Sequence, residues 1–237
     1  MVGSSILPAG TTRSMPIRKA VTRNFFCAWS RNMAYVLGFF LADGSMNQNS
    51  RGAYFIEFEI TDKLLLHDIR RVLGSNHKIS VRKKNNAKKF SYRLQIGSKE
   101  LFSDLMRLGV SPGKTARLKF PQVPEAYASD FVRDYFDGDG HVTISTYRRA
   151  ARNNRPTRVI LSGFTCANQI FITQLHAFLK KYANIQGGSV FYNKGSRLTF
   201  AKNDTLALYR FLYKNIDTSL LYLSRKREIF RKYFKGL

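Results

Sequence analysis

Residues 35–44 read YVLGFFLADG, and residues 131–140 read FVRDYFDGDG. Each stretch carries apolar residues at helical spacing and ends in an Asp-Gly pair, and Asp43 and Asp139 stand 139 − 43 = 96 residues apart. Self-similarity at a fixed separation indicates a duplicated structural unit. We therefore expect two similar halves, each of which begins with one of these stretches.

The residues that follow each stretch have the same order in both halves. Alternating, strand-like runs and apolar-periodic, helix-like runs succeed one another. In the first half they are residues 54–61, 63–73, 77–81, 92–96 and 99–108, and in the second half 159–165, 169–182, 189–192, 197–200 and 205–213. Each half therefore reads helix, hairpin, helix, hairpin, helix, and the two together predict an α+β fold.

A four-stranded antiparallel sheet covered by helices on one face buries that face and leaves the other open. Arg93 and Gln95 alternate with apolar residues in the first half, as do Arg197 and Thr199 in the second. We expect these polar side chains on the open face and the aromatic residues on the inner face. The open faces would then offer hydrogen-bond donors.

The charge of the chain predicts a polyanionic partner. Its 237 residues include 40 Lys and Arg against 15 Asp and Glu, a formal net charge of +25. Such a charge can serve solubility alone, but binding to nucleic acid is the favoured explanation for it. A membrane-surface role would need a basic amphipathic helix, and here the basic residues spread over short alternating segments. No apolar stretch approaches the about 20 residues of a membrane-spanning helix.

Basic side chains gather at matching places in the two halves, at the predicted hairpin loops. Clusters of this kind are suited to phosphate contact. Together with the four sheet residues, the predicted DNA-binding set contains Arg82, Lys83, Lys84, Lys88, Lys89, Arg148, Arg149, Arg152, Arg155, Arg158 and Lys194.

The Asp-Gly endings require more than ordinary helix termination. A glycine after a helix usually caps it in the left-handed conformation, which would explain Gly44 and Gly140. A helix C-terminus disfavours a carboxylate, however, so Asp43 and Asp139 call for a nearby cation. Two helices packed side by side would bring both carboxylates and backbone carbonyls together, an oxygen-rich set suited to Mg²⁺.

The N-terminal region has its own composition. Residues 1–42 contain five basic residues and no Asp or Glu. Such a segment fits an organellar transit peptide, a basic arm on DNA or a disordered leader. We assign residues 1–30 to this arm or leader, 31–122 to the first half and 123–237 to the second. Cys27 and Cys166 form no CxxC pair, so neither a disulfide framework nor a zinc site is indicated, and an intracellular protein is expected.

The paired motifs and the repeat around them, residues 33–235, resemble those of the single-chain LAGLIDADG homing endonucleases. The resemblance implies two pseudo-twofold αββαββα halves, each of which lays a concave sheet in the major groove of DNA. The motif helices would form the interface, where small residues such as Gly38 allow close approach. Asp43 and Asp139 would bind the metal, with the carbonyls of Ala42 and Gly138 as further ligands.

Other site residues follow from the same resemblance. Lysines that stabilise charge near the scissile phosphate correspond to Lys114 and Lys226, which follow their motif aspartates by 71 and 87 residues. Asp62 and Asn168 match a polar position that orders active-site water. Asp134 is a departure, because the family usually has glycine there. It either weakens the helix contact or lies just outside it.

The expected function is site-specific hydrolysis of both strands of a long asymmetric DNA target by a monomer that uses Mg²⁺, with Mn²⁺ or Ca²⁺ as other ions for the same sites. The alternatives are an intron maturase whose partner is intron RNA and a DNA-binding regulator without catalysis. The expected compartment is either an organelle (chloroplast or mitochondrion) or a prokaryotic cytoplasm, and the sequence does not decide between them. The target sequence does not follow from one chain.

Overall fold

The computed structural model describes residues 19–83, 90–113, 118–148, 150, 153–193, 195–217 and 220–235. Within these residues the chain forms two four-stranded antiparallel sheets, each accompanied by helices. The α+β class and the duplication predicted from the sequence are confirmed.

The first half begins with the motif helix α1 and continues through two hairpins, each followed by a helix. Its sheet has the strand order β1-β2-β4-β3. The bounds are α1 (Arg31–Asp43), β1 (Gly44–Gln48), β2 (Tyr54–Ile60), α2 (Lys63–Val72), β3 (Ile79–Arg82), β4 (Ser91–Gly97) and α3 (Lys99–Arg107).

The second half repeats this order, with the strands arranged as β5-β6-β8-β7. The bounds are η2 (Glu125–Tyr127), α4 (Ala128–Asp139), β5 (Gly140–Arg148), β6 (Pro156–Cys166), α5 (Gln169–Tyr182), β7 (Ser189–Tyr192), β8 (Ser196–Phe200), α6 (Lys202–Tyr213) and α7 (Ser224–Tyr233). Helix α7 is an addition that the repeat did not predict. Only Lys226 and Phe230 are buried on it, so it offers just one buried apolar residue as a signal in the sequence.

Alternation along the strands decides which face is buried. In β2, Ile56 and Phe58 are fully buried and Ile60 nearly so, whereas Glu57 and Glu59 have the opposite parity. The apolar residues pack against the helices. The intervening residues lie on the open face of the sheet.

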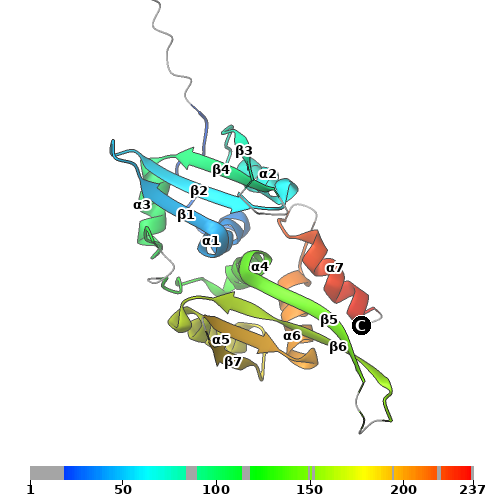
Figure 1. Ribbon diagram of the computed structural model, residues 1–237. Coiled ribbons are helices and arrows are strands. Elements are labelled where there is room, and N and C mark those ends of the chain that lie inside the picture. Colours follow the sequence, from blue (N-terminus) through cyan, green and yellow to red (C-terminus); the bar gives the residue numbers. More distant parts are fainter. Residues whose placement is uncertain are drawn as a thin grey trace, which may run out of the picture.

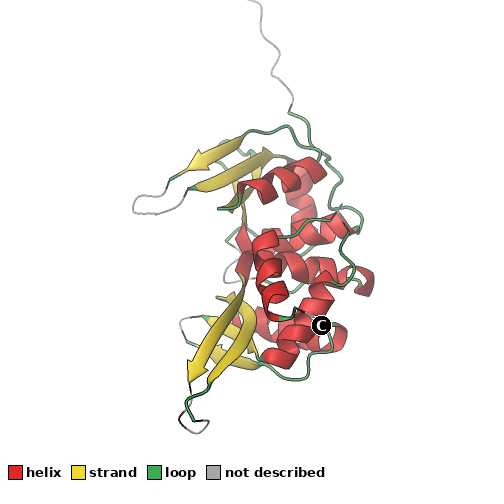
Figure 2. Ribbon diagram, turned by 90° about the vertical axis from the view of Figure 1, so that its right-hand side faces the viewer, coloured by secondary structure: helices red, strands yellow, loops and turns green. Residues whose placement is uncertain are grey.

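The motif helices α1 and α4 lie side by side at the centre, between the two sheets (Figure 1). Figure 2 shows the strands on one side of the molecule and the helices on the other. The two open faces therefore belong to the same side. Within the described ranges no helix has the length and apolar character needed to cross a membrane.

Residues 19–30, assigned above to an arm or leader, pack against the first half. The Thr22 amide donates to the Leu73 carbonyl at 2.9 Å, and Arg23 pairs with Glu100 at 2.9 Å. Phe26 is buried in the core. This segment is therefore part of the folded unit, and residues 1–18 lie outside the described part of the chain.

The expectation that aromatic residues turn inward is wrong for β7. Phe191 pairs in register with Arg197 rather than with the buried Leu198, so it lies on the open face, and it is 58% exposed. A strand at the edge of a sheet has neighbours on one side only, which lets a large ring stay in solvent.

Candidate active site and nucleic-acid interface

Glycines in the motif helices allow the two halves to approach closely. A Cβ on Gly38 would lie 2.3 Å from the Phe131 carbonyl oxygen, and one on Gly138 would lie 2.4 Å from the Ala42 Cβ. Both separations are far below van der Waals contact. The small residues that the sequence placed at this interface are therefore required by it.

The glycines after the motif helices have a different role from the one expected. Gly44 has φ −79° and ψ 159°, and Gly140 has φ −80° and ψ 158°, so neither is a left-handed cap. Each is the first residue of a strand. A Cβ on Gly44 would lie 2.5 Å from the Phe40 ring, and one on Gly140 would lie 2.3 Å from the Phe136 ring. Glycine is needed because the chain turns from helix to strand directly over a buried phenylalanine.

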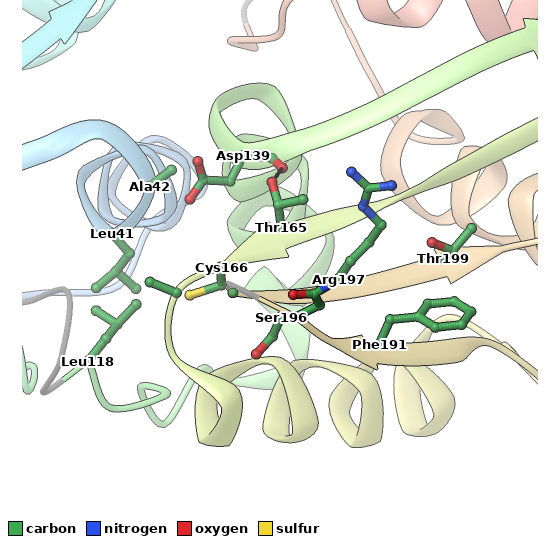
Figure 3. Close-up of a pocket in the computed structure, with 13 residues that line it drawn as sticks. Leu41, Ala42, Leu118, Asp139, Thr165, Cys166, Phe191, Ser196, Arg197 and Thr199 are labelled. Atoms are coloured by element: carbon green, nitrogen blue, oxygen red, sulfur yellow. Dashed lines mark hydrogen bonds between the residues drawn. The ribbon is translucent and has the colours of Figure 1, made fainter.

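The two motif aspartates meet at the end of this interface. The Asp43 Oδ2 lies 3.4 Å from the position that a Cβ on Gly138 would take, so it faces the opposite helix. The Asp139 carboxylate points toward Ala42 of α1 (Figure 3). Each carboxylate therefore reaches the end of the other half's helix, as the sequence predicted.

Asp139 lines a cavity of about 820 Å³ that opens on the second sheet, together with Thr165, Cys166, Arg197 and Thr199. Thr165 donates its hydroxyl to the Asp139 carbonyl at 3.2 Å. In Figure 3 the Arg197 side chain extends from β8 on the face where Asp139 lies. Catalytic candidates and sheet donors therefore share one surface.

The donor set at this place suits a hard divalent cation. Among the described residues no group of three or more His, Cys, Asp and Glu side chains is arranged so that it could hold a metal ion. Mg²⁺ is commonly held by one or two carboxylates, with water and substrate phosphate oxygens completing its shell. Asp43 and Asp139 meet that requirement, and each could hold a cation against a phosphate of bound DNA.

Lys226 occupies the carboxyl end of α4. Its Nζ donates to the carbonyls of Phe136 at 2.6 Å, Asp137 at 2.8 Å and Gly140 at 2.6 Å, with a longer contact of 3.4 Å to Gly138. An ammonium at this position stabilises the negative end of the helix. The positive charge that the motif requires is thus supplied partly by the chain itself.

The environment of Lys226 changes its basicity. Burial lowers the pKa of the ammonium to about 8, against the opposing effect of Asp137, Asp43 and Asp139. Sequence reasoning chose this lysine as a helper at the scissile phosphate. Its bonds give it a second role, because it holds the helix end from which Asp139 projects. The carbonyl of Gly138, a predicted metal ligand, also faces this ammonium.

Asp137 connects the start of α7, the helix that carries Lys226, to the motif helices by hydrogen bonds. Its Oδ2 accepts from the Leu223 amide at 2.7 Å and from the Tyr35 hydroxyl at 2.9 Å. Burial raises the pKa of Asp137 to about 6, although the Leu223 amide and Lys226 act in the opposite direction. Sequence reasoning missed this residue. The extra acidic residue in DYFDGD was the available signal.

Asp134 lies inside the helix contact and not beside it. The side chain is fully buried, and its Cβ is 3.2 Å from the position of a Cβ on Gly38. Burial, reinforced by Asp137, raises the pKa of this carboxyl well above its usual value. A carboxyl group therefore replaces the expected glycine, and beside Asp134 the close approach of the helices depends on Gly38 of the opposite helix.

Asp62 and Asn168 occupy matching positions as helix N-caps. Asp62 Oδ1 accepts from the Leu65 amide at 3.1 Å, and Asn168 Oδ1 accepts from the Phe171 amide at 3.0 Å. Asn168 also donates to the Leu118 carbonyl at 3.3 Å. Capping accounts for both residue types, and their ordering of active-site water stays a prediction.

Most described members of the DNA-binding set lie where the sequence placed them. The strand register places four of them on the open faces of the sheets, namely Arg93, Gln95, Arg197 and Thr199. Lys83, Arg148 and Arg155 are exposed near the hairpin ends, and Arg82 is the last residue of β3. Predicted members outside the described residues are Lys84, Lys88, Lys89, Arg149, Arg152 and Lys194, and the catalytic candidate Lys114 also lies outside them.

Arg158 is the exception within this set. It has the same parity as the buried Ile160, which turns it toward the helices. Its guanidinium donates to the Lys232 carbonyl at 3.3 Å and lies over the Tyr233 ring at 5.4 Å. The prediction that Arg158 sits in a hairpin loop is wrong, because β6 extends to Pro156.

The structure contains two pseudo-equivalent sheets, two motif helices in contact and an aspartate at the end of each helix, which is the arrangement that the resemblance to two-motif LAGLIDADG proteins predicts. Residues 30–108 match the profile of the LAGLIDADG-like domain family. The first half of the chain is thus similar to LAGLIDADG-like domains, and the second half repeats its fold. A comparison with curated protein sequences finds no match.

Solved structures of low sequence identity share this fold. The homing endonuclease I-WcaI bound to its DNA recognition sequence is 14% identical with a TM-score of 0.58, over 86% of this chain and 91% of that one. The meganuclease I-AabMI bound to uncleaved DNA is 12% identical with a TM-score of 0.56, over 82% and 86%. I-SmaMI bound to an uncleaved DNA target with calcium ions is 13% identical with a TM-score of 0.54, over 81% and 87%.

Proposed function

We propose that this protein is a homing endonuclease that binds a long, asymmetric double-stranded DNA site and hydrolyses one phosphodiester bond in each strand with the help of divalent cations. The observation that carries the proposal is the meeting of Asp43 and Asp139 at the junction of the halves. Two carboxylates at that junction can serve the two strands of one duplex.

The surface around the aspartates is suited to DNA. The two open sheet faces lie on one side of the molecule, and the chain carries a net charge of +25. Phosphate contacts give affinity and orientation, whereas sheet side chains can reach base edges in the major groove. The solved structure of the fold relative I-WcaI has the protein bound to its DNA recognition sequence, and that of I-SmaMI has it bound to an uncleaved DNA target.

The two halves differ in sequence, which favours a monomer that acts on an asymmetric site. A bound Mg²⁺ or Mn²⁺ would lower the pKa of an attacking water and stabilise charge on the phosphate. Asp43 and Asp139 would hold the ions, with the carbonyls of Ala42 and Gly138 as further ligands. Lys226 keeps the end of α4 in place by its carbonyl bonds. Lys114 is the proposed electrostatic helper for the other half.

The proposal is tested by separating binding from cleavage. A target would first be recovered from randomised DNA duplexes in Ca²⁺, and cleavage of that target would then be followed in Mg²⁺. Asp43→Asn and Asp139→Asn should each reduce the cleavage rate at least about 100-fold while leaving the Kd within a few-fold. Asp68→Asn, at an exposed carboxylate of α2, is the matched control. Undiminished cutting by both active-site variants would exclude the proposed site.

A further inference from the structure

The two sheets carry an arginine at the same position. Leu94 faces Phe58 in the first sheet, and Leu198 faces Phe164 in the second. Phe58 and Phe164 are in turn opposite the glycines that follow the two motif helices. The arginine before each leucine, Arg93 or Arg197, therefore occupies equivalent open-face positions.

The neighbours of these arginines differ in charge. Glu59 is directly opposite Arg93, and Glu57 is its diagonal neighbour on the same face. The corresponding residues beside Arg197 are Thr165 and Gly163. A Cβ on Gly163 would lie 2.0 Å from the Leu198 carbonyl oxygen, so this position excludes a side chain. The second sheet cannot present a carboxylate where the first presents Glu57.

In the first sheet the acidic residues are held by arginines. The Arg93 guanidinium forms an ion pair with Glu57, and these side chains are 19% and 10% exposed. Glu59 lies 3.7 Å from Arg82 and accepts from the Ser91 hydroxyl at 2.8 Å. Among the described residues no ion pair joins Arg197 to a carboxylate. The Nε of Arg93 is buried and has no hydrogen-bond partner.

This pair is unfavourable for simple attachment to DNA. Carboxylates on a surface that approaches a polyanion reduce electrostatic attraction, and desolvating an ion pair costs free energy of its own. The strand register places Glu57 and Glu59 on the open face of the sheet and not among the apolar residues of the core. Groups that weaken general binding in this way can provide selectivity instead.

The chemistry of the pair matches one base pair. In the major groove cytosine presents an N4 amino donor, and its partner guanine presents the O6 and N7 acceptors beside it. A carboxylate can accept a hydrogen bond from the cytosine N4 amino group, and a guanidinium can donate to the guanine O6 and N7. We propose that the Glu57–Arg93 pair reads one cytosine–guanine pair in the half-site bound by the first sheet. The proposal rests on the DNA-binding function above.

The experiment is selection of bound sequences from a randomised duplex library in Ca²⁺, which avoids any need for cleavage. Wild-type protein should enrich an asymmetric consensus with a fixed cytosine–guanine pair in one half-site. Glu57→Gln should lower the preference for that pair about five- to hundred-fold, with other positions unchanged. Glu228→Gln is the matched control, because Glu228 also pairs with an arginine, at 2.7 Å, but on α7.

Arg93→Lys provides an independent variant that keeps the positive charge beside Glu57, and it should weaken the same position by a similar factor because a lysine lacks the bidentate fork. Circular dichroism and thermal melting establish that each variant is folded. A consensus that is unchanged in both folded variants overturns the base-reading role while leaving the endonuclease proposal intact. If folded wild-type protein enriches no sequence, both proposals fail.

Discussion

Tyr35 donates its hydroxyl to Asp137 at 2.9 Å and so joins the motif helix of the first half to that of the second. Asp137 also accepts from the Leu223 amide, one residue before α7 begins. Lys226 lies in the first turn of α7 and binds the carbonyls at the end of α4. Asp137 therefore links the interface between the two halves to α7, the helix that carries Lys226.

Tyr35→Phe should destabilise the fold by about 1–3 kcal/mol, because a buried carboxylate oxygen loses a hydrogen-bond donor. Chemical denaturation followed by circular dichroism measures the change. Tyr147→Phe, at a tyrosine that is 48% exposed, should change the free energy of unfolding little. Equal effects of the two substitutions would show that the Tyr35 bond contributes nothing.

Gly38→Ala should destabilise the protein by about 1–3 kcal/mol through overpacking. The sign of the change in unfolding free energy distinguishes a packed from an exposed position, because Gly→Ala within an exposed helix stabilises a protein by about 1 kcal/mol. The alanine methyl would meet the Phe131 carbonyl oxygen at 2.3 Å. Gly97→Ala is the control, because its nearest neighbour would lie at 3.4 Å, an ordinary contact. A more stable Gly38→Ala protein would contradict the observed helix packing.

Asp134→Asn should increase stability at neutral pH. Burial and the nearby Asp137 raise the pKa of Asp134, while Arg133 and Tyr35 act in the opposite direction without cancelling the shift. A carboxyl whose pKa is higher in the folded state destabilises the fold increasingly as pH rises from the unfolded pKa, about 3.8, to the folded pKa. The amide cannot ionise, so this loss of stability is removed.

Unfolding free energies at a series of pH values test the Asp134 prediction. The difference between Asp134→Asn and wild type should be smallest near pH 4 and grow as pH rises. Asp68→Asn, on the exposed face of α2, is the matched control. A variant advantage that is independent of pH would mean that packing, and not ionisation, causes it.

Lys226→Met should destabilise the free protein by about 2 kcal/mol or more, because the buried carbonyls at the end of α4 lose their donor. A lysine that acted only on the scissile phosphate would leave this quantity unchanged. Thermal melting without DNA or metal therefore separates the two roles. Lys180→Met, at an exposed position of α5, provides the comparison.

DNA binding should weaken steeply with salt, because each phosphate contact releases counterions. Removing one phosphate contact by Arg148→Ala should reduce the slope of log K against log salt by about 0.9. Arg210→Ala, on the exposed side of α6 away from the sheets, should leave the slope unchanged. Equal slopes for wild type and Arg148→Ala would remove Arg148 from the interface.

The repeat and the polarity patterns were sufficient for the architecture. Alternation in β2 and β4 identified the buried face, and helical spacing located α5 from Gln169 to Tyr182. Local periodicity carries this information because each strand or helix must bury one side. It could not identify α7, whose basic sequence buries only Lys226 and Phe230. That helix is positioned by Asp137, 86 residues away from its Leu223 partner.

The sequence by itself determined that two aspartates, Asp43 and Asp139, end two equivalent helices in a strongly basic chain. Only the tertiary structure decided that Asp134 is enclosed in the helix contact, that Lys226 occupies the end of α4, and that Arg93 forms an ion pair with Glu57. The physical reason is the separation along the chain between the residues that interact. Periodicity reports which side of an element is buried, whereas the partner of a charged side chain comes from a distant segment that only folding brings near.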